Sequence, residues 1–479
     1  MKNAYQTLMK TGATAFQSLL LLGVFSFDAF GQTDNNHRLT LQMAVTLAQQ
    51  EDPWIAGNRL RQSALEAKSV ASGTLPDPTL SLSMANLPID GFDFSQEAMT
   101  QFKVGINQMF PQGDSLAVRQ KQLRQLSQQF PYQRSDRKAQ VAIIVSHLWL
   151  DAYKAEQSIA LIEKSRSLFE QLTDVAQASY SSTIGKTRQQ DIVRAQLELT
   201  RLEDRLTQLK LAKETSLEKL GEWTRKYSVD SPATEVSTTL KQGEKQLANK
   251  VPDIALINHE LTAVNNRHAR QQLSQILMNH PAVLAIENKI TASKTGIELA
   301  EQKYKPAWGL SASYGYRDND PQGNSRADFL SVGVSFEIPF NTSNRQDKEV
   351  AAAISNSAAI KTEKWQLMRK MLAQFEATKS QLHRLTQRQQ LYASRLLPQM
   401  HEQAEASLTA YTNDDGDFSE VVRARIAELN AEIDALAINL DKQKTIVSLN
   451  YFLVSNNLDA MVKDQTAQSL VEINRVGEQ

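Results

Sequence analysis

The chain contains no cysteine. Disulfide bonds, thiolate metal ligands, a cysteine nucleophile and lipid attachment through an N-terminal cysteine are therefore excluded. Glycine and proline are also sparse, at 18 and 13 of the 479 residues. This composition suits long helices better than a compact sheet protein.

Neither sign of charge is in excess, because 53 Lys and Arg side chains balance 53 Asp and Glu side chains. A nucleic-acid-binding protein needs a basic surplus to neutralise phosphates, so no nucleic-acid partner is expected. The sequence also lacks a Gly-rich phosphate loop, paired histidines at metal-ligand spacing and a nucleophile motif. We therefore predict neither enzymatic activity nor a cofactor or metal site.

The N-terminus has the pattern of a secretory signal. Lys2 and Lys10 precede an apolar run over residues 15–27, and the sequence AFG then ends at Gly31. A positively charged start, a short apolar core and a cleavage site flanked by small residues predict a cleavable signal peptide over residues 1–31. The alternative is a membrane anchor, but about 13 apolar residues fall short of the ~20 that a spanning helix needs. No later segment is apolar enough to span as a helix.

Three pairs of prolines with similar flanking residues are separated by one constant distance, 281 − 53 = 306 − 78 = 339 − 111 = 228. The pairs are Pro53 with Pro281, Pro78 with Pro306, and Pro111 with Pro339. Such a constant period predicts a duplicated unit. We expect the first repeat to cover residues 32–270 and the second to cover 271–455, followed by a C-terminal tail over 456–479.

Each repeat contains two segments in which apolar residues alternate with small polar residues. They cover residues 79–87 and 101–110 in the first repeat and 308–316 and 328–338 in the second. A period of two over ~10 residues is typical of a tilted membrane strand. We expect the strands to join the helices at Pro78, Pro111, Pro306 and Pro339.

The alternative for these strands is a small sheet with one face on a core and one face in water. Two observations favour the membrane. The polar face consists almost entirely of Ser, Gly and Asn, and the aromatic residues Phe110, Trp308 and Tyr316 lie at strand ends, where membrane interfaces place them. Four strands cannot close a barrel, and lipid does not tolerate open sheet edges. Three chains would supply twelve strands and a water-filled lumen, so we expect a homotrimer in contact with lipid.

The segments from Gly113 to Gly185 and from Gly333 to Gly416 contain no internal glycine. About 70 helical residues reach on the order of 100 Å, far more than a globular core requires. Gly185 and Gly416 stand where each long helix must reverse, which suits a positive φ. The sequence therefore predicts two helical hairpins with tips far from the sheet, in a mostly α protein with a membrane β-barrel.

Two further patterns bear on these helices. Pro131 and Pro398 lie inside the long segments and are expected to kink or break them. The returning helices carry apolar residues at alternating steps of three and four, which is the 3.5-residue period of helices packed in a coiled coil. These residues are Ile192, Ala195, Leu199, Leu202, Leu206 and Leu209, and Val422, Ile426, Leu429, Ile433, Leu436 and Leu440.

The sequence resembles the TolC-like outer-membrane efflux family. The resemblance is carried by the predicted signal peptide, the duplicated halves, the proline-bounded strand pairs and the two tips, YSSTIGKTRQQDIVRAQ (180–196) and YTNDDGDFSEVVRAR (411–425). The resemblance covers residues 39 to 455. It implies a homotrimeric exit duct in the outer membrane of a Gram-negative bacterium. It also implies a periplasmic adaptor (membrane fusion protein) at the tips, an inner-membrane pump of the RND type, and an equatorial belt that includes residues 223–271.

Within that family, the stretches PDPTLSLSMANLPIDGF (76–92) and SVGVSFEIPFNTSNRQDKEVAAA (331–353) resemble the heavy-metal branch. Multidrug efflux and type I protein secretion use the same architecture and stay open as alternatives. A periplasmic coiled-coil adaptor is a further alternative, although adaptors lack two duplicated strand pairs. The residues His147, His280 and His383 are scattered and do not have metal-ligand spacing.

In the family an Asp six residues after the first tip glycine helps to hold the tip closed, and Asp191 matches it here. The places of its usual Tyr and Arg partners are occupied by Asn413 and Phe418. The resemblance therefore implies an altered gate, in which Tyr411 or Arg423 could substitute.

The second tip is acidic, with Asp414, Asp415 and Asp417 beside Gly416. In a trimer these residues would place nine carboxylates near the entrance, which favours cations. The alternative is an ordinary solvated acidic turn.

Overall fold

The computed structural model describes residues 38–181, 188–225, 246–259, 261, 267–413 and 416–454. The predicted signal peptide and C-terminal tail lie outside these ranges, as do the tip residues Gly185, Asp414 and Asp415. Only part of the predicted equatorial segment is described. Its Leu247 forms a parallel bridge with Leu39, just before the first helix.

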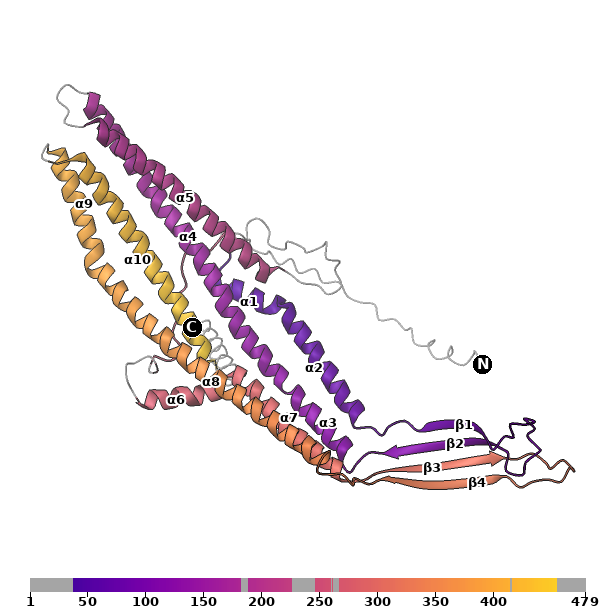
Figure 1. Ribbon diagram of the computed structural model, residues 1–479. Coiled ribbons are helices and arrows are strands. Elements are labelled where there is room, and N and C mark those ends of the chain that lie inside the picture. Colours follow the sequence, from indigo (N-terminus) through magenta and orange to yellow (C-terminus); the bar gives the residue numbers. More distant parts are fainter. Residues whose placement is uncertain are drawn as a thin grey trace, which may run out of the picture.

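Helices dominate the described chain, and a four-stranded sheet projects from one end of the elongated helical part (Figure 1). The N-terminal half contains α1 (Leu41–Glu51), α2 (Pro53–Ser72), β1 (Thr79–Ala85), β2 (Gln101–Phe110), α3 (Ser115–Ser127), α4 (Gln129–Ser181) and α5 (Gln189–Thr224). The C-terminal half contains α6 (Arg267–Met278), α7 (Pro281–Glu301), a 3₁₀ turn (Gln302–Tyr304), β3 (Ala307–Tyr316), β4 (Phe329–Glu337), α8 (Gln346–Leu391), a π-helical turn (Tyr392–Leu396), α9 (Leu397–Thr412) and α10 (Phe418–Phe452).

Both predicted helical hairpins are present, and they run side by side away from the sheet (Figure 1). In the first, α4 has 53 residues, which is about 80 Å of helix, and α5 returns along it. In the second, α8 and α9 form the outgoing arm, and the 35-residue α10 returns. The tips of both hairpins therefore lie at the end of the molecule opposite the sheet.

The two prolines predicted to disturb the long helices do so. Pro131 lies in the first turn of α4, directly after a break at Gln128. A proline is tolerated there because the N–H groups of a first helical turn have no partner within the helix. Pro398 is near the start of α9 and follows the π-helical turn. Because proline offers no N–H to the preceding turn, the helix widens locally instead of continuing as a regular α-helix.

The repeat is visible in how α2 and α7 begin. Each has proline at its first position, after a side chain that caps the helix. The carboxylate of Asp52 accepts from the backbone N–H of Trp54 at 3.0 Å, and the ring of His280 accepts from the N–H of Ala282 at 3.2 Å. Asp52 and His280 are separated by the same 228 positions as the prolines.

The sheet is antiparallel in the order β1-β2-β3-β4, so the pairing of β2 with β3 joins the two halves of the chain. The four predicted strands are confirmed within one or two residues at each end. The two hairpins differ in register by two residues, because Thr79 pairs with Asn107 whereas Ala307 pairs with Glu337. A shift of two preserves which side chains share a face.

The core is divided among three clusters along the helices. One surrounds Trp149, whose indole N–H donates to the carbonyl of Leu39 at 2.9 Å. A second surrounds Phe375 and Phe452, and a third lies nearer the tips around Phe169 and Phe418. The predicted 3.5-residue stripes contribute to the first and third clusters. Their buried members are Ala195, Leu202, Leu206, Val422, Leu429, Ile433 and Leu440. Each helix is thus held by one apolar face along its length.

Candidate functional site

The pleat of the sheet places nearly all of its large apolar side chains on one face. Along each strand, alternate residues point to the same side, and the observed register aligns them across all four strands. The aliphatic residues of this face are Leu80, Leu82, Met84, Val104, Ile106, Leu310, Ala312, Leu330, Val332 and Val334. They form a continuous apolar surface.

No part of the described chain buries this apolar face. Leu80 and Leu82 are 66% and 64% exposed, and Leu330 and Val332 on the opposite edge strand are 76% and 69% exposed. Figure 1 shows the sheet projecting beyond the helices rather than packing on them. Within the described ranges the sheet has no face on a core, which contradicts the alternative of a small sheet with one face on a core. An exposed apolar surface of this extent marks a contact with lipid or with another protein.

Aromatic side chains lie at both ends of the apolar face. Near the helices, the rings of Phe110 and Trp308 stack at a centroid distance of 3.9 Å, and Phe336 pairs with Trp308 across the sheet. At the far end, Tyr316 stacks on Phe94 at 6.3 Å. Two aromatic rows on either side of an aliphatic band are typical of a membrane-spanning strand sheet. Ten residues of tilted strand correspond to a band of about 25 Å.

The opposite face of the sheet is mostly small and polar, although Met109, Phe329 and Glu337 also lie on it. It carries Ser81, Ser83, Gly105, Asn107, Gly309, Ser311, Ser313, Gly315, Ser331, Gly333 and Ser335. The glycines give room to their neighbours, since a Cβ on Gly105 would lie 2.7 Å from the hydroxyl of Ser81. One cation, Lys103, lies on this face near the end of the sheet that is remote from the helices, opposite Ser83 on β1 and Gly315 on β3. This face can line a water-filled space.

The four prolines predicted to mark the junctions lie at the helix end of the sheet. Pro78 and Pro306 directly precede β1 and β3, and Pro111 directly follows β2. Pro339 comes two residues after β4. Because proline cannot donate to a strand ladder, it is found at the edges and ends of strands. The outer strands β1 and β4 each have one edge without a partner among the described strands.

At the first tip, Asp191 is buried at 5% exposure and acts as a local helix cap. Its carboxylate oxygen Oδ2 accepts from the backbone N–H of Arg188 at 3.0 Å, at the start of α5. A carboxylate at this end of a helix is stabilised by the unpaired N–H groups of the first turn. Asp191 thus has a partner within its own chain, and its predicted gate contact stays a prediction.

At the second tip, Asp417 caps α10 by accepting from the N–H of Ser419 at 3.0 Å. The ring of Tyr411 packs against buried Phe418 edge to face, with centroids 5.6 Å apart. Phe418, at the position where the resemblance implies an arginine, is therefore part of an apolar contact. The positive φ expected of Gly416 stays a prediction, because this angle depends on the preceding residue, which lies outside the described ranges. The position is tight, because a Cβ would lie 2.6 Å from the backbone nitrogen of Tyr411.

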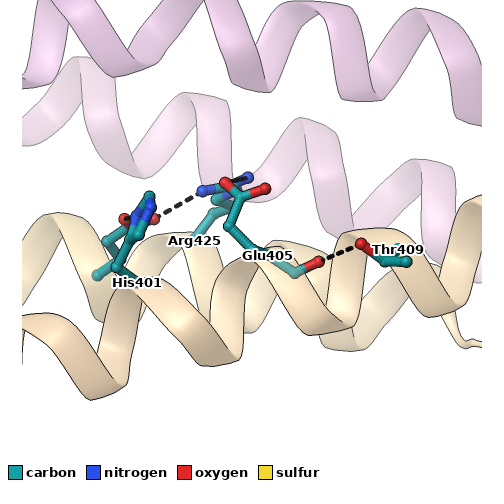
Figure 2. Close-up of polar contacts among 5 residues, drawn as sticks. His401, Glu405, Thr409 and Arg425 are labelled. Carbon is teal, nitrogen blue, oxygen red and sulfur yellow. Dashed lines mark hydrogen bonds and ion pairs between the residues drawn. The ribbon is translucent and has the colours of Figure 1, made fainter.

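A polar cluster between α9 and α10 was missed by the sequence analysis. The guanidinium of Arg425 bonds Glu405 at 2.6 Å and Glu428 at 2.9 Å, and Nδ1 of His401 lies 2.6 Å from Glu428. Figure 2 shows His401 and Glu405 on one helix beside Arg425 on the other, with Thr409 one turn beyond Glu405. The hydrogen bond to Glu428 and its charge raise the pKa of His401 above its usual value. The only sequence signal was acidic and basic residues three or four positions apart.

His280 has a structural role. His280 is fully buried, and burial lowers its pKa to about 4, so its ring is neutral. Since Nδ1 accepts from Ala282, Nε2 carries the proton and donates to the carbonyl of Tyr451 at 3.0 Å. Within the described part of the chain, no three His, Cys, Asp or Glu side chains are grouped so that they could hold a metal ion.

None of the helices in the described ranges combines the length and apolar character that crossing a membrane requires.

Neither known protein-family models nor curated protein sequences match this chain. Solved structures do. CusC, described in connection with transmembrane channel formation, is 14% identical with a TM-score of 0.68, over 89% of this chain and 96% of that one. The open-state outer-membrane channel MtrE of Neisseria gonorrhoeae is 14% identical, with a TM-score of 0.65 over 86% and 88%. The Campylobacter jejuni outer-membrane channel CmeC is 12% identical, with a TM-score of 0.66 over 86% and 85%.

The chain therefore has the fold of TolC-like outer-membrane channels. Four strands and two long helical hairpins per chain fit one third of a twelve-stranded barrel that continues as a helical tunnel. At these identities the likeness defines the fold, and the activity of the chain has to be argued from its own residues.

Proposed function

We propose that this chain is one subunit of a homotrimeric exit duct in the outer membrane of a Gram-negative bacterium. Twelve pooled strands form the pore, and the helical hairpins continue it through the periplasm. The duct conducts passively, because the work of transport is done by an inner-membrane pump of the RND type. A periplasmic adaptor joins the two at the hairpin tips.

The observation that carries this proposal is the exposed two-faced sheet. Its apolar face, with Leu82 at 64% and Val332 at 69% exposure, matches lipid, and its Ser- and Gly-rich face matches a water-filled lumen. The open edges of β1 and β4 require strand partners, since unpaired backbone groups are costly in lipid. Copies of the same chain supply those partners with closed rotational symmetry.

We propose heavy-metal cations as the cargo. The support is the acidic second tip, where Asp417 is exposed at the start of α10 and Asp414 and Asp415 are its neighbours in sequence. Rings of carboxylates at an entrance raise the local concentration of cations. Conduction does not require the duct to bind its cargo, so the proposal needs no metal-ligand cluster. Drugs and secreted proteins are the competing cargoes.

We propose that the tips form both the gate and the adaptor contact. Gly185, Asp191, Tyr411, Gly416 and Asp417 belong to this region, as do the two neighbouring aspartates. Asp191 is buried beside the start of α5, where a neighbouring subunit could add a second partner to its carboxylate. Since the family's Tyr and Arg positions are changed, we expect closure to rely on packing around Phe418 more than on ion pairs.

The test combines localisation with a deletion phenotype. Membranes of the source bacterium are fractionated, and the protein is examined by gel electrophoresis with and without heating. An outer-membrane trimer that dissociates on heating is the expected result. A deletion strain is then exposed to copper, silver, zinc, cobalt and cadmium salts and to a panel of drugs. Sensitivity to one or two metals, restored by the gene, is expected.

The outcomes separate the parts of the proposal. Sensitivity to drugs alone would keep the duct and overturn the metal cargo. A monomer in the soluble periplasmic fraction would overturn the duct itself.

A further inference from the structure

The chain passes from a strand into a long helix at two equivalent junctions, one in the middle of the sheet and one at its edge. At the first, β2 leads to α3, whose N-cap residue is Asp114. At the second, β4 leads to α8, whose N-cap residue is Arg345. The first junction has β3 of the same chain beside it, because β2 lies between two strands. The second has one side without a neighbour among the described strands, because β4 is an edge strand.

At the internal junction an ion pair ties the two halves of the chain together. The carboxylate of Asp114 accepts from the ammonium of Lys305 at 3.2 Å, and Lys305 stands two residues before β3 begins. The amide oxygen of Gln302 also accepts from the backbone N–H of Asp114 at 3.1 Å. A helix N-cap residue that follows one strand is thus bonded to a charged residue that precedes the next strand.

The two edges of the sheet carry the same two positions with the charges exchanged. The N-cap residue after β4 is the cation Arg345. The residue 228 positions before Lys305 is the anion Asp77, which stands two residues before β1. Asp77 is exposed and has no hydrogen bond or ion pair to another residue of the described chain. Each copy therefore has a cation beside one edge strand and an anion beside the other.

The charge of Arg345 is not explained by contacts within its own chain. A cation is unfavourable at a helix N-terminus, and Arg345 makes no side-chain capping hydrogen bond there. Its guanidinium lies 3.9 Å from the carboxylate of Glu337, and both side chains are more than half exposed. An exposed pair at this distance contributes little, so the guanidinium is available to a better-placed carboxylate.

A pocket of about 150 Å³ beside Arg345 indicates that this edge is incomplete in a single chain. Its lining includes Lys305, Glu337 and Gln346. Gln346 is 6% exposed, and its amide oxygen Oε1 has no hydrogen-bond partner among the described residues. Buried polar atoms are almost always paired, so this oxygen indicates a donor from outside the chain. The proposed duct places a neighbouring copy at this edge.

We propose that Arg345 of one copy forms an ion pair with Asp77 of the next copy, at the seam where β4 pairs with the neighbour's β1. This inference rests on the proposed homotrimer. The edge strands meet antiparallel, because β1 leaves the helix end of the sheet and β4 returns to it. The residues before β1 and after β4 therefore come together, as Lys305 and Asp114 do inside the chain. A head-to-tail contact of this kind closes into a ring, and three copies form three such pairs.

The first test exchanges the charges in the full trimer recovered from outer membranes. The measurement is the temperature at which the trimer dissociates into monomers on a gel. Asp77→Arg and Arg345→Asp each place like charges at the seam, so each is expected to lower this temperature by several degrees. Aspartate is a favoured N-cap residue, so Arg345→Asp does not weaken α8 itself. The double variant restores opposite charges and is expected to dissociate close to the wild-type temperature.

The second test measures proximity across the seam. The chain has no cysteine, so Asp77→Cys combined with Arg345→Cys introduces the only thiols. A short thiol-specific crosslinker is expected to join the copies into covalent trimers that survive heating. The matched control is Asp114→Cys with Lys305→Cys, whose side chains meet within one chain. It is expected to give only monomers after heating.

Single charge reversals without effect, or a double variant as labile to heat as the single ones, would overturn the ion pair and leave the duct intact. Absence of covalent trimers from Asp77→Cys with Arg345→Cys would do the same. Failure to recover any trimer of the wild-type protein from membranes would overturn the proposed duct and the seam contact with it.

Discussion

At Gly416 the chain passes so close to itself that a side chain has no room. A Cβ would lie 2.6 Å from the nitrogen of Tyr411 and 2.9 Å from the carbonyl carbon of Ala410, and both are backbone atoms that cannot rotate away. The turn between α9 and α10 must therefore open to accept any other residue. Tyr411 and Phe418, whose rings meet at this turn, would be displaced together.

We expect Gly416→Ala to destabilise the second hairpin by about 1–3 kcal/mol, the range found when extra atoms are forced into a packed site. The measurement is thermal unfolding followed by circular dichroism in detergent. Gly57→Ala in α2 is the matched control, because a Cβ there meets only the end of the Arg61 side chain at 3.8 Å. It is expected to stabilise by roughly 0.5–1 kcal/mol. Equal melting temperatures for the two variants would contradict this account.

His401 gives the second hairpin a dependence on pH. Its pKa is raised in the folded chain by the hydrogen bond and the charge of Glu428, with Glu405 adding attraction and Arg425 opposing it. A raised folded pKa means that protonated His401 stabilises the fold. This contribution is complete below the unfolded pKa of about 6.5 and is lost as pH rises through the folded value.

We therefore expect the melting temperature to decrease more steeply in the wild type than in His401→Gln as the pH rises above about 6.5. Half-buried His147 and buried His280 have lowered pKa values, so they titrate at more acidic pH and are present in both proteins. Thermal scans of the two proteins across this range provide the comparison. Parallel pH profiles would show that the contact between His401 and Glu428 contributes nothing.

At the scale of elements, the sheet is defined by the difference between its two faces. Neighbouring residues on one strand point into different media, so their substitutions should have opposite consequences. Val332 lies on the apolar face and is 69% exposed, whereas Ser331 faces the other side, opposite Ser313.

We expect Val332→Arg to cost about 2–4 kcal/mol, the range for an arginine facing lipid near the middle of a barrel, and to reduce the trimer recovered from outer membranes. Ser331→Arg, one residue earlier, is expected to yield a normal amount of trimer because its side chain faces water. Quantitative gels of heated and unheated outer membranes measure both. If Ser331→Arg were lost and Val332→Arg retained, the faces would be assigned the wrong way round.

At the scale of the whole molecule, three copies of the sheet would enclose one lumen. Lys103 is on the polar face between Ser83 and Gly315, so a trimer would place three ammonium groups at one level of the pore. A ring of fixed charge in a narrow aqueous pore repels ions of its own sign. The ring of Lys103 side chains in the barrel would therefore disfavour cations, whereas the acidic tip would favour them.

We expect Lys103→Glu to move the reversal potential in a potassium chloride gradient toward cation selectivity. Lys103→Gln, which removes the charge without reversing it, should give an intermediate value. Trimers reconstituted in planar bilayers provide the measurement. An unchanged reversal potential in both variants would show that Lys103 does not face the conducting path.

The main features of this molecule were determined by short-range patterns in its sequence. The alternation of Leu80, Leu82 and Met84 with serine specifies a strand between two media, because successive strand residues point to opposite sides. The glycine-free segments and their 3.5-residue stripes specify long paired helices. Proline marks the ends of both kinds of element, since it removes the N–H that continues them. Each of these signals depends only on neighbours along the chain.

Other features were decided by the tertiary structure. The two-residue difference in strand register, the tight space at Gly416, the cluster around Arg425 and the pocket beside Gln346 all depend on groups that pair across the fold. Arg425 and Glu405 are 20 positions apart, and Lys305 and Asp114 are 191 apart. Which polar groups meet at such separations depends on how the helices and strands pack, and no periodicity in the sequence specifies that packing.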